Sequence, residues 1–192
     1  MKKVLENEFK NLPENFVVMA IVPFKNFEEA NMHLLSMIIK RYNSKGSYIN
    51  INRPYKSMVQ LLDDKNINTK NLFFIDCITK EVRESTGENE NCYFVGSPSN
   101  LTEIAIALDP VFKEGKHKFI FLDSLDTLAI YNPIESVIKF AHFLTSKVRL
   151  HNLSGVMLAV HENSDERLMM DLAQFCDKVI DLREFPTTAV YR

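Results

Sequence analysis

The sequence predicts a three-layer α/β domain built on a mainly parallel sheet. Strand-like and helix-like patterns alternate almost without interruption along the 192 residues. The strand-like segments are continuous apolar runs, which is the pattern of a parallel sheet covered by helices on both faces. The length suits one well-cored domain, and no linker, internal repeat or low-complexity tract divides it. We therefore expect residues 1–192 to form a single domain.

The first unit of this pattern is a strand, a tight turn and a helix. Residues 16–22 are an apolar, β-branched run that predicts a buried strand, and residues 23–26 turn the chain into a helix. Asn26 is placed to cap that helix, with Glu29 as the reciprocal partner of a capping box. Glu28 and Glu29 would stabilise the positive end of the helix and would repel a triphosphate there.

The remaining elements continue the alternation. Apolar runs predict the strands, and apolar residues spaced three and four apart, often after a proline or asparagine, predict the helices. A polar, charged stretch between two of the strands predicts an exposed loop. The further strands are residues 47–52, 71–76, 92–95, 119–123, 156–160, 178–182 and 189–191, the further helices are 54–62, 101–112, 133–148 and 165–175, and the loop is 79–91.

Composition excludes several classes of function. The chain has 23 Lys and Arg against 25 Asp and Glu, and this balance gives no general attraction to nucleic acid or to an anionic membrane. Cys77, Cys92 and Cys176 are far apart and form no CxxC pair, so we expect neither a disulfide framework nor a zinc site. No apolar stretch approaches the roughly 20 residues that span a bilayer, and the N-terminus does not read as a signal peptide. We expect a cytoplasmic protein with no membrane partner.

Four segments, in this order and spacing, resemble the RecA/KaiC branch of the P-loop ATPases from about Leu12 to Arg192. Residues 11–18 are similar to the lead-in that the family places before its phosphate loop. Residues 119–125 resemble its second nucleotide motif, an apolar strand that ends in Asp-Ser. Residues 154–162 and 175–183 look like the following strand and the KaiC-like close. The resemblance implies a doubly wound, RecA-like P-loop NTPase fold.

The phosphate loop of that family, G-x-x-x-x-G-K-[ST], falls on residues 21–28 and is not present. Its two glycine positions hold Ile21 and Asn26. Its lysine position holds Phe27, and its Ser/Thr position holds Glu28. The glycines let bare backbone amides wrap phosphate, and the lysine and hydroxyl hold phosphate and magnesium, so all of these functions are missing from the motif.

The family's water-activating acid is missing as well. In KaiC-like ATPases the strand after the first helix usually ends in that acid, and here the strand end, residues 50–54, has no carboxylate. Of the family's nucleotide-binding groups only the acidic strand end Asp123 remains. The resemblance therefore implies a chain with no catalytic residues, no cofactor and no ATP hydrolysis.

Polar side chains nevertheless gather where the predicted strands end. In a doubly wound sheet, ligands bind beyond the carboxyl ends of the strands. Such side chains could bind a divalent cation or perform acid–base chemistry, but the interpretation we favour is that they cap helices and turns. The residues of this predicted cleft are Arg53, Asp76, Asp123, Asp126, His161 and Glu162.

Three functions follow from these observations. We favour an interaction or regulatory protein that has lost the ATPase activity of its family and assembles as a homo-oligomer or with an active RecA/KaiC-like paralogue. The first alternative is a metal-dependent hydrolase, or a protein that binds nucleotide in an altered mode, using the acids at the strand ends. The second is a recombination or DNA-binding accessory, against which the lack of a clustered basic and aromatic strip argues.

Overall fold

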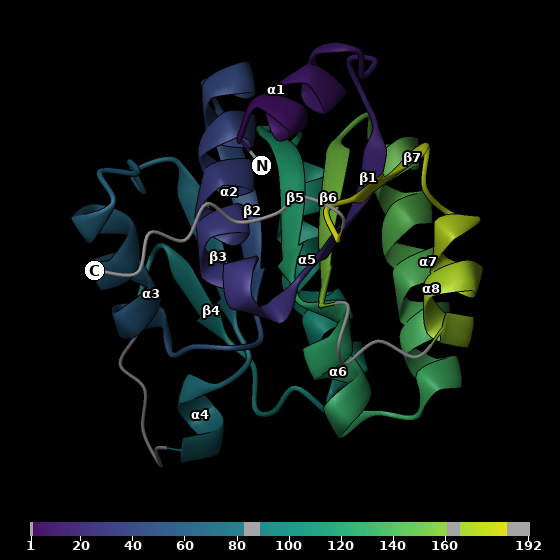
Figure 1. Cartoon of the computed structure of the whole chain (residues 1–192). Helices are drawn as coiled ribbons and strands as arrows, with labels where there is room; N and C mark the ends of the chain where they lie inside the picture. Colours follow the sequence, from purple (N-terminus) through teal and green to yellow (C-terminus); the bar gives the residue numbers. More distant parts are fainter. Residues whose placement is uncertain (1, 83–88, 161–165, 184–192) are drawn as a thin grey trace.

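A sheet of parallel strands forms the centre of the computed structural model, which describes residues 2–82, 89–160 and 166–183 (Figure 1). Within these residues the strands are β1 (Val17–Val22), β2 (Lys45–Asn50), β3 (Leu72–Asp76), β4 (Cys92–Phe94), β5 (His117–Asp123), β6 (Ser154–Val160) and β7 (Lys178–Asp181). The helices are α1 (Lys2–Lys10), the 3₁₀ turn η1 (Phe24–Asn26), α2 (Phe27–Tyr42), α3 (Tyr55–Asp64), α4 (Thr79–Val82), α5 (Leu101–Glu114), α6 (Leu125–Tyr131), α7 (Ile134–Leu150) and α8 (Glu166–Ala173).

The seven described strands lie in the order β4-β3-β2-β5-β6-β1-β7, and every neighbouring pair is parallel. Parallel neighbours need crossover connections, which the helices supply. All carboxyl ends therefore lie at one edge of the sheet, where Figure 1 shows α6 and the start of α2 at the bottom of the view. The predicted α/β class with a mainly parallel sheet is confirmed.

Helices cover both faces of the sheet, and strand side chains alternate between the two layers. In β1, Val18 and Ala20 pack in the layer of α1, α2 and α3, whereas Met19 and Ile21 pack in the layer of α5 to α8. Both sets are buried, which explains why β1 is a continuous apolar run and not an alternating one.

The predicted elements agree with the structure to within a few residues, and three helices were not predicted. These are α1, α4 inside the predicted loop 79–91, and α6 directly after Asp123. The predicted strand 189–191 lies outside the described residues. In the described part of the chain, no helix is both long enough and apolar enough to cross a bilayer.

The predicted capping box at the start of α2 is wrong. Within the described structure, the Asn26 side chain does not accept a hydrogen bond from the first turn of the helix. The reason is the backbone: Asn26 has φ −111° and ψ 3° and closes a 3₁₀ turn, its N–H donating to Pro23 O at 2.9 Å. A capping side chain needs an extended backbone at the cap residue, so in this 3₁₀ turn the Asn26 side chain does not point at the N–H groups of the first turn of α2.

Candidate functional site

Three polar residues form a row at the carboxyl edge of the sheet. Asn50 at the end of β2 is in register with Asp76 on β3 and with Asp123 on β5. Registered residues of parallel strands point to the same face of the sheet. Two residues before Asn50 in β2, Tyr48 lies on this face, in the layer of α2 and α3. Asp76 and Asp123 are therefore separated by two strand spacings, about 10 Å between their backbones.

Asp123 is enclosed by hydrogen-bond donors from three other segments of the chain. Its side chain is buried, with 2% of the residue exposed. Tyr48 donates its hydroxyl to Oδ2 at 2.5 Å, and Asn31 of α2 donates to the same oxygen at 2.7 Å. Asn52, in the loop after β2, donates to Oδ1 at 2.7 Å. We call these four residues the Asp123 network.

The electrostatics of the network follow from burial. Burial raises the pKa of the Asp123 carboxyl above its ordinary value, and the hydrogen bonds from Tyr48, Asn52 and Asn31 work in the opposite direction. Burial, followed by the nearby Asp123 charge, raises the pKa of the Tyr48 phenol well above its usual value. Tyr48 therefore stays a protonated donor, and the distance to Asp123 is that of a charge-assisted O–H···O⁻ bond.

The network joins four elements and ends at the protein surface. Thr127 of α6 donates its hydroxyl to Asn52 Oδ1 at 2.6 Å and lies 3.1 Å from the Ser124 hydroxyl. The Tyr48 ring stacks on Phe121, with centroids 5.3 Å apart and planes 11° from parallel. The start of α2, strands β2 and β5, and α6 are thus fixed relative to one another at this edge.

An ion pair lies beside the network. Arg53 Nη2 is 2.7 Å from Glu28 Oε2, and each side chain is about half exposed. Asn50 fixes the backbone of the arginine, because its side chain donates to Arg53 O and accepts from Arg53 N. Such an exposed pair adds at most about 1 kcal/mol of stability. Its position matters more, since it joins the start of α2 to the loop after β2.

The other acids of the predicted cleft bind separate partners. Asp76 accepts hydrogen bonds from the backbone N–H groups of Tyr55, Ile78 and Thr79, at 2.5, 2.7 and 2.8 Å, and so caps two helices. Asp126 accepts from the Val160 N–H. His161 and Glu162 lie outside the described residues.

Within the described residues, no three His, Cys, Asp or Glu side chains come together in a way that could hold a metal ion. Asp76 binds the backbone at two helix starts, Asp126 binds the backbone at the end of β6, and Asp123 accepts its hydrogen bonds from neutral side chains. The described acids therefore do not form a convergent acid–base or metal site.

Three members of the network were not predicted from the sequence. Asn31 lies among apolar residues on the buried face of α2, and Tyr48 lies inside a buried strand. A polar side chain on an otherwise apolar helical face is a signal that could have pointed to Asn31. Asn52 carries no such signal, because an exposed asparagine after a strand is common in turns.

No protein-family model and no curated protein matches the sequence. Solved structures do match it, at 7–11% identity. A KaiC-like protein of Pyrococcus horikoshii OT3 has 11% identity and a TM-score of 0.59, over 88% of this chain and 72% of its own. An uncharacterized protein of Pyrococcus horikoshii, solved in complex with an unknown peptide, has 11% identity and a TM-score of 0.70, over 93% and 82%.

The flagellar accessory protein FlaH of Methanocaldococcus jannaschii has 7% identity and a TM-score of 0.57, over 88% of this chain and 72% of its own. At such low identity these likenesses show the fold alone. The chain has the RecA/KaiC-like ATPase fold, as its motifs predicted.

Proposed function

We propose that this RecA/KaiC-fold protein does not hydrolyse ATP and acts as an interaction or regulatory protein. The observation that carries the proposal is the ion pair between Glu28 and Arg53. Glu28 stands at the sequence position of the family's metal-binding hydroxyl, and its carboxylate is held 2.7 Å from the Arg53 guanidinium. A side-chain anion of the protein thus occupies the start of the helix that carries the phosphate loop in active relatives.

Electrostatics at this helix start support the proposal. Glu28 and Glu29 lie in the first turn of α2, where they complement the positive end of the helix. A triphosphate here would meet two carboxylates, and the family's lysine position offers it no charge because it holds Phe27. Arg53 is already paired with Glu28, so it offers an incoming phosphate less compensation than a free cation would.

Asp123 is the second support, because it is the one nucleotide-motif acid that the chain keeps. A carboxylate has about four lone-pair positions, and three donors already bind this one. Magnesium is bound in near-octahedral geometry and keeps several waters, so a metal at the one remaining position of Asp123 would have to bring water into a buried site. Asp123 serves the fold in this proposal and not a reaction.

The proposed partner is a second copy of the chain or an active ATPase of the same fold. One structural neighbour was solved in complex with an unknown peptide, which is consistent with a fold of this kind binding protein segments. The carboxyl edge offers fixed surface residues for such a contact. Asn52 and Arg53 are exposed there and held in place by Asp123 and Asn50.

The test combines an activity assay with a mass measurement on the full chain. We expect no phosphate release from ATP in the presence of magnesium, and we expect the Glu28→Gln variant to behave in the same way. Glu81→Gln, at an exposed acid outside the ion pair, is the matched control. Light scattering measures the particle mass of the chain, both by itself and with a co-purified ATPase. If the chain assembles as proposed, the mass exceeds that of one chain. Steady ATP turnover by the unmodified chain would overturn the proposal.

A further inference from the structure

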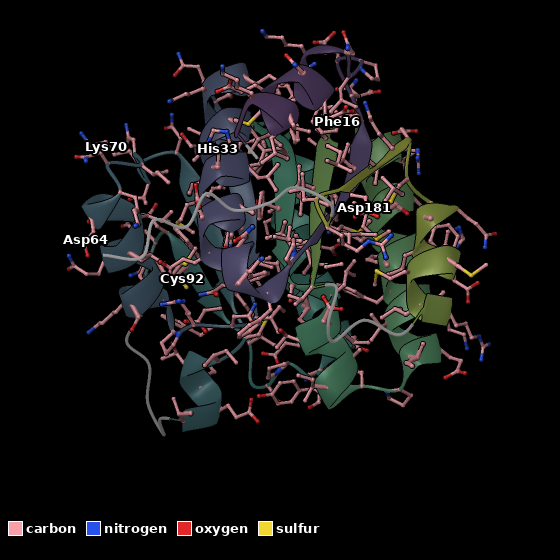
Figure 2. The ribbon with its side chains drawn as sticks, in the orientation of Figure 1. Phe16, His33, Asp64, Lys70, Cys92 and Asp181 are labelled. Atoms are coloured by element: carbon pink, nitrogen blue, oxygen red, sulfur yellow. The ribbon has the colours of Figure 1, made fainter. Side chains whose placement is uncertain are left out.

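A groove runs along the surface of α2, in the helical layer that also contains α1 and α3. Its volume is about 410 Å³, and the residues that follow α3 bound it on one side. This volume lies within the range of about 300–1,000 Å³ that binding sites in proteins occupy. Figure 2 shows His33, which lines the groove, on α2, and Asp64 at the outer edge of the molecule, where α3 ends. We call this feature the α2–α3 groove.

The floor of the groove is apolar. Met32 of α2 and Ile67, after α3, line the groove and belong to the same core layer on the same face of the sheet. They are 6% and 8% exposed, whereas most residues of this layer are almost completely buried. Their accessible atoms would be removed from water by a further apolar side chain placed over them.

The rim of the groove carries charges of both signs. Glu28 and Glu29 lie in the first turn of α2, and Lys65 directly follows α3. Glu28 is paired with Arg53, but within the described part of the chain neither Glu29 nor Lys65 takes part in an ion pair. The groove therefore favours an apolar segment that brings a cation to Glu29.

The path of the chain after β7 leads toward this groove. Leu182 is 1% exposed, packs in the layer of α1, α2 and α3, and donates its N–H to Ile21 O at 2.9 Å. The chain is thus brought to the face of the sheet that α2 covers. Helix α2 leads from β1 to β2, and four strand spacings, about 19 Å, separate β7 from β2. Residues 184–192 span about 30 Å when extended, so they can cross α2 and reach the groove.

The sequence of residues 184–192 matches the groove. It reads Glu-Phe-Pro-Thr-Thr-Ala-Val-Tyr-Arg, so Val190 and Tyr191 are followed by the cation Arg192. Pro186 restricts the residue before it to an extended backbone, which favours a spanning segment over a helix. An apolar pair next to a cation is the combination that the floor and the rim favour.

We propose that residues 184–192 form a strap across α2 and fill the α2–α3 groove. Val190 and Tyr191 cover the apolar floor, and Arg192 lies beside Glu29. A tethered segment has an effective concentration on the order of millimolar, so the strap outcompetes other chains and closes this face of α2 to them. The contact is made within one chain, so it does not rest on the proposed function.

NMR of the full chain tests the strap directly. We expect nuclear Overhauser contacts between the Tyr191 ring and the Met32 methyl group. The Tyr191→Ala variant removes the ring and should shift the Met32 methyl signal, whereas the methyl signal of Met170, which is 71% exposed on α8, should not move. Tyr131→Ala is the matched control, because Tyr131 is exposed on α6 and does not line the groove, and it should leave the Met32 signal unchanged.

Amide hydrogen exchange tests the charged contact. We expect the backbone amides of residues 189–191 to exchange about tenfold more slowly than those of an unstructured peptide. Glu29→Gln should reduce this protection about threefold, which is the effect of one exposed ion pair. Glu81→Gln, at an exposed acid outside the groove, is the matched control and should not change it.

Three results would overturn the proposal. The first is the absence of contacts between Tyr191 and Met32. The second is a strand pairing of residues 189–191 at an edge of the sheet, as the sequence pattern predicted. The third is contacts that arise only between labelled and unlabelled copies in a mixed sample, because a second copy would then fill the groove. ATP turnover is not affected by any of these results, so the proposed function stands or fails separately.

Discussion

Replacing Tyr48 with phenylalanine removes one hydroxyl from the Asp123 network and leaves the aromatic packing in place. The ring keeps its stacking on Phe121 at 5.3 Å and its contact with Phe74 at 5.8 Å. What is lost is the 2.5 Å donation to Asp123 Oδ2, together with the 2.9 Å hydrogen bond that Asn31 Nδ2 donates to the phenol oxygen. A hydrogen bond to a charged group contributes about 1.5–3 kcal/mol, and Asn31 still donates to the same oxygen. We therefore expect Tyr48→Phe to lower the free energy of unfolding by about 2 kcal/mol.

Urea unfolding followed by circular dichroism measures this loss, with Tyr131→Phe as the matched control. Tyr131 lies on the surface end of α6 and is 40% exposed, so its hydroxyl should contribute less than about 0.5 kcal/mol. The slope of unfolding free energy against urea should be the same in both variants and in the natural chain. A Tyr48→Phe variant as stable as the Tyr131→Phe variant would refute the interpretation that the phenol supports a buried, ionised Asp123.

Three further predictions concern the same edge and the packing behind it. Burial raises the pKa of Asp123 in the folded chain, so the folded state keeps this proton to a higher pH than the unfolded state does. The natural chain should therefore lose stability relative to the Asp123→Asn variant as the pH rises from about 4 through the folded pKa. Urea unfolding of both chains at a series of pH values measures this difference. Arg53 lowers the pKa of Asp123, so Arg53→Gln should raise that pKa further, measurable by carboxyl NMR, while an exposed pair costs at most about 1 kcal/mol when broken. Gly46→Ala places a Cβ 2.0 Å from the Phe119 ring, and the forced repacking should cost about 1–3 kcal/mol in thermal unfolding, whereas Gly115→Ala meets no atom within 4 Å and strains only a positive φ.

The strands of the sheet could be predicted because a strand that is buried on both faces is a continuous apolar run in the sequence. The β1 and β5 segments are continuous apolar runs, and the structure places β5 at the centre of the sheet and β1 one strand in from the edge, with both faces of each strand buried. Helix α6 escaped prediction because it has 7 residues, too few to display a helical period clearly. The predicted capping box is wrong because the residue types at Asn26 and Glu29 do not specify the backbone φ and ψ angles, which decide where a side chain points.

The candidate site was predicted only in part, and the reason is geometric. Asp123 stood out because it ends an apolar strand. Its partners Asn31, Tyr48 and Asn52 come from segments 92, 75 and 71 residues away in sequence. Contacts over such separations depend on strand order and register, which a single sequence does not specify. The Glu28–Arg53 pair was missed for the same reason, although both residues had been singled out separately.

Calorimetric titration of magnesium–ATP into the full chain tests most directly whether the protein's own side chains have closed the phosphate site. We expect no heat of binding at protein and nucleotide concentrations that saturate an ordinary P-loop ATPase. Saturable binding of one ATP per chain, abolished by exchanging Asp123 for alanine, would contradict the account, because it would mean that the enclosed carboxylate still serves a nucleotide.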